Sequence, residues 1–297
     1  MLNQQVMNRI QHIRMVTRQL MQGAQSGQAV TTQRGYGIEF HQVRDYVVGD
    51  DVRFIDWKGS ARFNRLLVKE CLEERNRRII IALDVSSSVL YGSYQKKNDL
   101  MRDVAALLAF AGQYSQDSVG LVFFDDQVRQ VIPPHNTINH VHHLVTALYR
   151  YEPQGQAVTD IGAAITYCAQ RWHKDSMVFL VSDFIDTQGT ENVRVHSRGV
   201  DLVALRCYDH AERFLPADGG LLLEDIETGQ RVQVDSLAWI NALLRERWIK
   251  QSNALRGAGI DVVDVDAHAD YSAQLIALFK HRSMGHAGIH IQRSMLR

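Results

Sequence analysis

The sequence predicts an α/β fold in which a doubly wound, mostly parallel sheet follows an N-terminal helix and a small β module. Two patterns along the chain lead to this prediction. After residue 76, apolar segments of strand length alternate with helical segments, which is typical of parallel strands joined by crossover helices on both faces. Before that point, shorter segments alternate between apolar and polar residues. We therefore expect two units, residues 1–76 and residues 77–297.

The first unit is expected to begin with an amphipathic helix over residues 3–22. Apolar residues recur there at helical spacing, at Val6, Ile10, Ile13, Val16 (or Met15) and Leu20. We expect this face to dock on the rest of the chain rather than on a partner. A stretch rich in Gly, Ser and Gln follows and predicts a loop. The next alternating segments, with a turn at Gly49-Asp50-Asp51, predict the β module.

The second unit contains the segments of the parallel sheet. Strands are expected over residues 78–86, 118–126, 176–184, 200–209 and 260–267. Helices are expected over residues 99–115, 138–151, 159–172, 237–259 and 271–282. A hairpin near residues 219–235, turned at Thr228-Gly229, should extend the sheet edge or pack beside it.

Composition limits the class of protein. With 297 residues, 45% of them hydrophobic, the chain can bury one substantial core beside a smaller module. Its 33 basic and 33 acidic residues cancel, so no net field draws it to nucleic acid or anionic lipid. The three cysteines are scattered, which argues against disulfides or a zinc knuckle and favours a reducing compartment. Neither a signal peptide nor an apolar stretch of membrane-spanning length is found, so a soluble, cytoplasmic protein is expected.

Oxygen-bearing side chains gather at the predicted ends of the strands. Asp84, Ser86 and Ser88 alternate after the first strand, Thr159 opens a helix, and Asp183 ends another strand. Loops at the carboxyl ends of parallel strands line one crevice, so these side chains should meet at one rim. Hydroxyl and carboxylate oxygens suit Mg²⁺. An isolated Asp-x-Ser-x-Ser also occurs by chance at turns and helix caps, so the prediction of a metal site depends on three loops converging.

These five residues, in this chain order, resemble the complete metal-ion-dependent adhesion site of von Willebrand factor A domains. In addition, the segment GIEFHQVRDYVVGDDVRFIDWKGSARFNRLLVKECLEE resembles the diagnostic segment of the bacterial family called domain of unknown function 58. The resemblance continues through SDF and LLLEDIETGQ to the final helix. It implies a von Willebrand factor A-like sheet carrying an added β module.

The resemblance also implies a function. The serines and the threonine would bind Mg²⁺ (or Mn²⁺/Ca²⁺) directly or through water, the aspartates mainly through water, and an open position would accept an acidic residue of a client protein. The implied partner is a MoxR-type AAA+ ATPase that acts with the chain in assembling or activating other proteins. Many relatives carry N-terminal transmembrane helices, which are not found here. The threonine loop, Gln156 to Asp160, also lacks a glycine common in the family.

Other functions are less well supported by the sequence. Basic and aromatic residues are interleaved between Arg44 and Lys69, as in single-strand binders, but they fit a structural or protein-contact role equally well, and no nucleic acid is expected. The histidines of NHVHHLV lack further zinc ligands and indicate a solvated helix face. A Mg²⁺-dependent phosphohydrolase using the Asp84 loop remains the alternative. The expected DxD is absent, as are a nucleophile elbow and a phosphate-binding loop, so we expect no enzyme.

Overall fold

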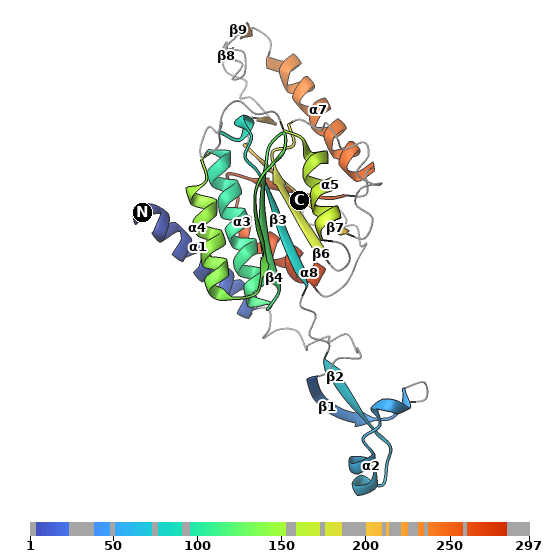
Figure 1. The fold of residues 1–297 in the computed structure, drawn as a ribbon. Coiled ribbons are helices and arrows are strands. Elements are labelled where there is room, and N and C mark those ends of the chain that lie inside the picture. The colour runs from blue at the N-terminus through green and yellow to red at the C-terminus, as the bar shows by residue number, and fades with distance from the viewer. Residues whose placement is uncertain are drawn as a thin grey trace.

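A mixed α/β architecture with a central six-stranded sheet is seen in the computed structural model of the chain (Figure 1). The structure describes residues 4–23, 39–47, 51–72, 77–90, 96–152, 159–172, 176–185, 200–209, 212–213, 221–224, 231–234, 237–257 and 260–283. The strand order is β10-β7-β6-β3-β4-β5. These strands span Asp261–Asp266, Val200–Tyr208, Ser176–Ser182, Arg78–Asp84, Ser118–Phe124 and Val128–His135, respectively. All neighbouring pairs are parallel except β4 with β5, which confirms the predicted mostly parallel sheet.

The antiparallel edge strand β5 was not predicted from the sequence. It contains Pro133 and Pro134, which cannot donate backbone hydrogen bonds and therefore argue against a central strand. At an edge, a strand needs a partner on one side only, so prolines are tolerated there. β5 pairs with β4 through a register shift between Val119 and Leu121, which is consistent with an irregular edge.

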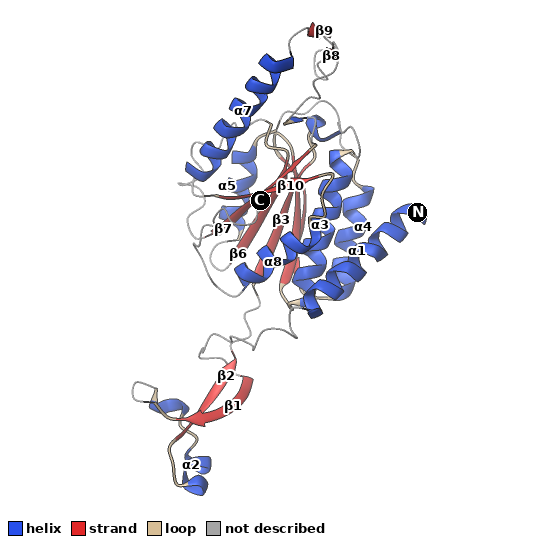
Figure 2. Cartoon of the chain, turned by 180° about the vertical axis from the view of Figure 1, so that it is seen from behind, coloured by secondary structure: helices blue, strands red, loops and turns tan. Residues whose placement is uncertain are grey.

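Helices cover both faces of the sheet because side chains of its strands alternate between two cores (Figures 1 and 2). In β3, Ile79, Ile81 and Leu83 join one core, and Ile80 and Ala82 join the other. The first core includes side chains of α1 (Gln4–Gly23), α3 (Lys97–Tyr114), α4 (Ile138–Arg150) and α8 (Ser272–Ser283). The second includes side chains of α5 (Ile161–Arg171) and α7 (Leu237–Gly257). This is the doubly wound arrangement that the sequence predicts.

The N-terminal helix α1 docks on the sheet domain, as predicted. Its apolar face buries Ile10, Ile13 and Met21 in the first core. Its neighbours are α3 and α8, two helices that lie far from it in the sequence. The buried hydroxyl of Thr17 donates to the carbonyl of Ile13 one turn earlier, so this polar residue is satisfied inside the apolar face.

The small module combines a β-ribbon with helical turns. Its antiparallel strands β1 (Glu39–Asp45) and β2 (Leu67–Leu72) enclose the 3-10 turn η1 (Val52–Phe54) and the helix α2 (Trp57–Phe63). The antiparallel ribbon confirms the predicted small β module. The helix α2 was not predicted, and it ends where Asn64 adopts a left-handed conformation. In the predicted turn, Asp51 caps η1, whereas Gly49 and Asp50 lie outside the described residues.

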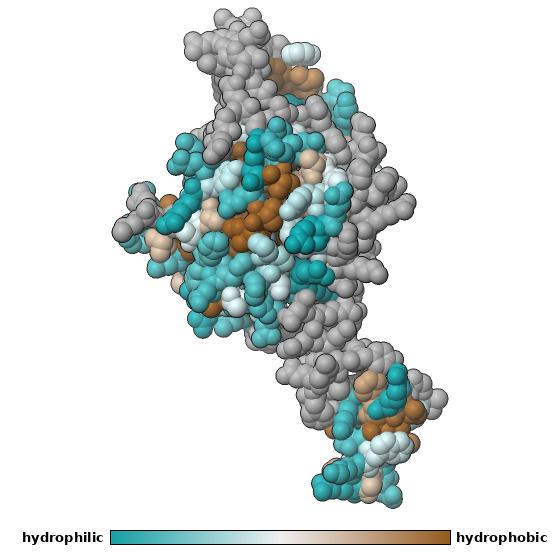
Figure 3. Space-filling model, in the orientation of Figure 1, coloured by the Kyte–Doolittle hydropathy of each residue, from teal (hydrophilic) through white to brown (hydrophobic). Residues whose placement is uncertain are grey.

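Apolar side chains remain exposed on this module (Figure 3). They belong to Val43, Val47, Val52, Trp57, Phe63 and Leu66. The module is too small to bury all of its apolar residues within its own ribbon and helix.

The predicted hairpin is present as β8 (Leu221–Glu224) and β9 (Arg231–Val234). It forms a separate two-stranded sheet, so the first expected arrangement, extension of the edge of the main sheet, is wrong. The second, packing beside the sheet, stays a prediction. Its predicted turn at Thr228-Gly229 lies outside the described residues, as do the loop after α1 and residues 156–158. None of the helices in the described part of the chain is both long and apolar enough to cross a membrane.

Candidate metal centre

The five predicted site residues lie where strands end or helices begin. Asp84 is the last residue of β3, and Ser86 and Ser88 follow it, with Ser88 in the 3-10 turn η2 (Ser87–Leu90). Asp183 directly follows β6, and Thr159 lies two residues before α5. Because β3 and β6 are adjacent and parallel, their carboxyl ends share one edge of the sheet. We call these five residues the rim.

Thr159 is held at the rim by the start of α5. The side chain of Asp160 caps this helix by accepting a hydrogen bond from the backbone N–H of Ala163. The backbone N–H of Asp160 donates to the carbonyl of Asp125, the residue after β4. The threonine therefore approaches Asp84 from the side of β4, whereas Asp183 follows the neighbouring strand on the other side.

Asp84 is the centre of the rim. Its Oδ1 accepts a hydrogen bond of 2.9 Å from the backbone N–H of Ser86. Its Oδ2 accepts one of 2.6 Å from the hydroxyl of Ser182 and a longer one of 3.4 Å from the hydroxyl of Thr159. The carboxylate is completely buried, so these donors replace the water that would otherwise solvate it. Asp84 thus has a fixed orientation.

Ser182 is a part of the site that the sequence analysis missed. It is the last residue of β6, and its hydroxyl links Asp84 to the backbone N–H of Phe184 at 3.0 Å. Phe184 has a φ of 53°, so the chain turns sharply just after Asp183. In the sequence, Ser182 is a single serine in an apolar strand, and it belongs to no motif of regularly spaced polar residues. Its only signal is its position next to Asp183.

The hydroxyls of Ser86 and Ser88 have the spacing that a small divalent cation requires. Their oxygens lie 3.0 Å apart. Two adjacent ligands of an octahedral Mg²⁺ ion, each about 2.1 Å from it and at right angles, lie about 3 Å apart. The pair therefore fits one edge of such an octahedron, although the same distance is also that of an ordinary hydrogen bond.

The charges at the rim also fit a cation. Burial and, after it, the nearby negative charge of Asp183 raise the pKa of Asp84 to about 6, against the opposing effect of the hydrogen bonds from Ser182 and Ser86. Two carboxylates that repel each other in a buried place are stabilised by positive charge. The donor set, two carboxylates and three hydroxyls, consists of hard oxygens and suits Mg²⁺, Mn²⁺ or Ca²⁺.

A buried lysine already provides one positive charge at this place. The ammonium of Lys97, the first residue of α3, lies 2.7 Å from Oδ2 of Asp183 and 2.6 Å from Oε1 of Glu212. The lysine side chain is 0% exposed. Burial alone would lower the pKa of Lys97, but the two carboxylates raise it above its ordinary value, so the side chain is charged. Neither Lys97 nor Glu212 could be identified from the sequence, because these two residues and Asp183 lie far apart along the chain.

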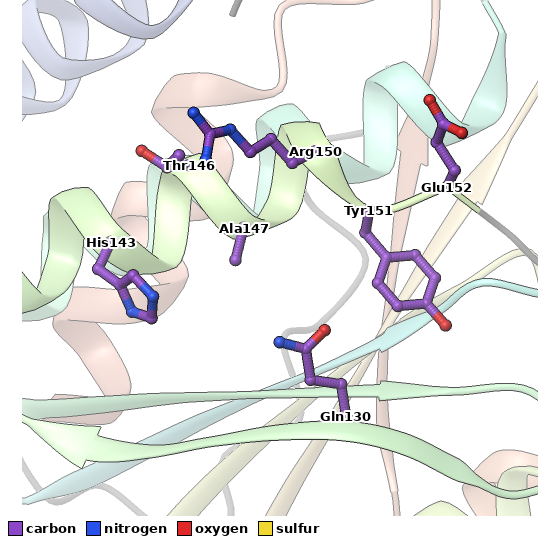
Figure 4. Close-up of a pocket in the computed structure, with 7 residues that line it drawn as sticks. All are labelled: Gln130, His143, Thr146, Ala147, Arg150, Tyr151 and Glu152. Atoms are coloured by element: carbon purple, nitrogen blue, oxygen red, sulfur yellow. The ribbon is translucent and has the colours of Figure 1, made fainter. Parts of the chain in front are cut away.

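A separate hollow lies between α4 and β5 (Figure 4). His143, Ala147 and Tyr151 face Gln130 across it. It shares no residue with the rim. Within the described residues, no three histidine, cysteine or carboxylate side chains are grouped as metal ligands, either in this hollow or elsewhere. The candidate site is the oxygen cluster at the rim, with its two carboxylates and three hydroxyls.

Comparison with known proteins identifies the family. Residues 42–257 match the family described as "Protein of unknown function DUF58". A Mycobacterium bovis protein described as uncharacterized is 22% identical over 285 residues, covering 92% of this chain and 88% of the relative.

Solved structures with a similar but weakly matching fold include BatB from Bacteroides thetaiotaomicron, at 18% identity and a TM-score of 0.46, covering 70% of this chain and 98% of BatB. The VWA domain of SpRpn10 matches at 10% identity and a TM-score of 0.37, covering 68% and 94%. These structural similarities carry no information about metal, partner or activity. The sequence match covers most of the chain, and the chain belongs to the DUF58 family.

Proposed function

We propose that this chain is a non-enzymatic, metal-dependent scaffold or adaptor that binds another protein through its rim. The rim would hold one divalent cation, Mg²⁺ (or Mn²⁺/Ca²⁺). The observation that carries the proposal is the 3.0 Å spacing of the Ser86 and Ser88 hydroxyls beside two buried carboxylates. When bound, the cation supplies a coordination position for a carboxylate of a client protein.

The donors of the rim support capture of an acidic residue. Serine and threonine hydroxyls are neutral, so a cation that they hold keeps most of its charge. Both oxygens of Asp84 already accept hydrogen bonds, which favours contact with the cation through water or hydroxyls over direct neutralisation. A carboxylate from another protein can then displace water from the cation in a partly desolvated interface.

The partners and location are proposed from the family resemblance. A MoxR-type AAA+ ATPase would act with this chain, in the cytoplasm, to assemble or activate an unknown client that presents an acidic residue. The sequence has no phosphate-binding loop, so ATP hydrolysis would belong to the partner.

The phosphohydrolase alternative requires Asp84 to reach a substrate. Asp84 is 0% exposed, and both of its oxygens already accept hydrogen bonds, which favours a structural role in the site over attack on phosphorus. Metal-dependent hydrolysis of phosphate esters that is lost in Asp84→Ala would favour the alternative.

The proposal is tested by association with a MoxR-type ATPase in a pull-down with purified proteins. Chelation, Ser86→Ala and Asp183→Ala should each reduce the bound ATPase, because each removes the cation or a donor. Ser87→Ala is the matched control, since Ser87 lies between the two serines of the rim and is not one of the five residues. Circular dichroism should show that the variants remain folded. Unchanged association in all three cases would exclude the rim as the docking surface and favour the small module.

A further inference from the structure

The most unusual charged group of the described chain is Lys97. Lysines are almost never fully buried unless they are paired, yet this side chain is 0% exposed at the N-terminus of α3. The positive end of a helix is also an unfavourable place for a cation. Two acidic groups compensate, Asp183 of the rim and Glu212, which comes from the chain beyond β7. Through its contact with Asp183, the buried lysine is therefore linked to the candidate metal site.

We infer that Lys97 tunes the metal centre: its permanent charge offsets Asp183, so the rim binds a divalent cation less tightly and leaves it free to accept a partner's carboxylate. This inference rests on the proposed function of the rim. It makes Lys97 a positioning residue, because the lysine acts on the cation through Asp183.

The geometry of Asp183 supports this role. Its Oδ1 accepts the backbone N–H of Ile185 at 3.1 Å, and its Oδ2 accepts the ammonium of Lys97 at 2.7 Å. Each oxygen is therefore already engaged on one side, which leaves Asp183 suited to holding a cation through an intervening water. The positive charge of Lys97 therefore offsets the negative charge that Asp183 offers to a cation, and the low exposure of the ion pair limits screening by solvent and salt.

Glu212 has the opposite effect on the same site. It contacts Lys97 at 2.6 Å and offsets part of its charge. Its other oxygen, Oε2, accepts the backbone N–H of Asp209 just after β7, which holds the carboxylate in place. Removing the charge of Lys97 should tighten cation binding, and removing the charge of Glu212 should weaken it.

A purely structural role for Lys97 leads to a different expectation. If the lysine only joins α3 to the segment of Glu212, its loss would loosen the rim and weaken cation binding, or leave binding unchanged. The sign of the change in affinity therefore separates the two roles.

The experiment is a calorimetric titration of MnCl₂ into the full chain and four variants. Lys97→Met should bind Mn²⁺ at least about tenfold more tightly than wild type. Glu212→Gln should bind Mn²⁺ several-fold more weakly than wild type. Lys97→Arg keeps the charge and should stay within about twofold of wild type. Lys96→Met is the matched control, because Lys96 is the exposed neighbour and its loss changes the net charge equally.

Thermal melting of the same proteins provides a second measurement. Without metal, Lys97→Met should melt at a lower temperature because two carboxylates lose their partner, and Mn²⁺ should raise its melting temperature more than that of wild type. If Lys97→Met fails to fold even with Mn²⁺, the Mn²⁺ affinity of Glu212→Gln tests the inference instead. An affinity equal to that of wild type would overturn the inference. Weaker Mn²⁺ binding, with an unchanged melting temperature in the absence of metal, would support it.

The outcomes also separate this inference from the proposed function. Wild type that binds no Mn²⁺ contradicts both. Wild type that binds Mn²⁺, with a folded Lys97→Met that binds equally or more weakly, overturns only the role of Lys97.

Discussion

At the residue scale, Asp117 is a buried carboxyl whose side chain accepts a backbone hydrogen bond. It lies between α3 and β4, is 3% exposed, and accepts the backbone N–H of Arg77 at 3.2 Å. Burial raises the pKa of Asp117 to about 7, although the N–H and the charge of Arg77 lower it in part. In the unfolded chain this carboxyl has a pKa of about 3.9. The native state therefore keeps a proton that the unfolded state loses between about pH 4 and pH 7.

This shift predicts how stability depends on pH. The contribution of Asp117 to stability is complete below about pH 4 and is lost as the pH rises through about 7, because the native state must then ionise a buried group. Asp117→Asn cannot ionise and keeps a carbonyl acceptor for Arg77. At pH 8 it should raise the free energy of unfolding by on the order of 1 to 3 kcal/mol.

Denaturant unfolding at pH 5 and pH 8 checks this prediction. The gain from Asp117→Asn should be larger at pH 8. A gain that is the same at both pH values would show that Asp117 ionises normally in the folded protein.

Residues of the rim could be predicted from the sequence only where spacing reveals them. Asp84, Ser86 and Ser88 alternate within five residues, and Asp183 ends an apolar strand. The structure brings them together with Thr159 as expected, although their binding of metal stays a prediction. Ser182, Lys97 and Glu212 join the same cluster through tertiary contacts, which no local pattern encodes.

At the element scale, α1 is attached to the sheet domain by a buried polar contact as well as by its apolar face. The carboxylate of Asp103 on α3 accepts a hydrogen bond of 2.7 Å from Nε of Arg9 on α1. Its other oxygen accepts the hydroxyl of Tyr149, at the end of α4. Asp103 is 5% exposed and therefore depends on these partners. Three helices meet at one charged group.

We expect Arg9→Met to destabilise the protein by about 2 kcal/mol. The loss should be below the roughly 3 to 5 kcal/mol typical of a broken buried pair, because the side chain of Arg9 is 35% exposed. Arg18→Met is the control, since Arg18 is exposed on the same helix and should change the free energy of unfolding by less than about 0.5 kcal/mol. Equal effects of both substitutions in urea unfolding would argue against the contact between Arg9 and Asp103 as an anchor.

The elements that the sequence predicted and those that it missed differ in their local signals. Most of the five parallel strands are nearly continuous apolar segments, and the helix α1 has a clear helical periodicity of apolar residues. By contrast, β5 contains two prolines, and α2 is only seven residues long and lies between alternating segments, so tertiary context decides both.

At the scale of the whole molecule, the fold places Asp84 at the end of a central strand that is packed on both faces. β3 lies in the middle of the sheet, between β6 and β4, and its residues Ile79 to Leu83 alternate between the two cores. Asp84 follows directly on this strand. The donors at its end are therefore held by packing on both faces, which favours a preformed cation site over one that must be ordered by the ligand.

The central claim is that the rim holds a divalent cation, and calorimetric titration of MgCl₂ into wild type and Asp84→Ala tests it most directly. Asp126→Ala is the control, because Asp126 is an exposed carboxylate just after β4. We predict that wild type and Asp126→Ala bind one Mg²⁺ per chain and that Asp84→Ala binds at least about tenfold more weakly while remaining folded. Equal binding by a folded Asp84→Ala would contradict the claim.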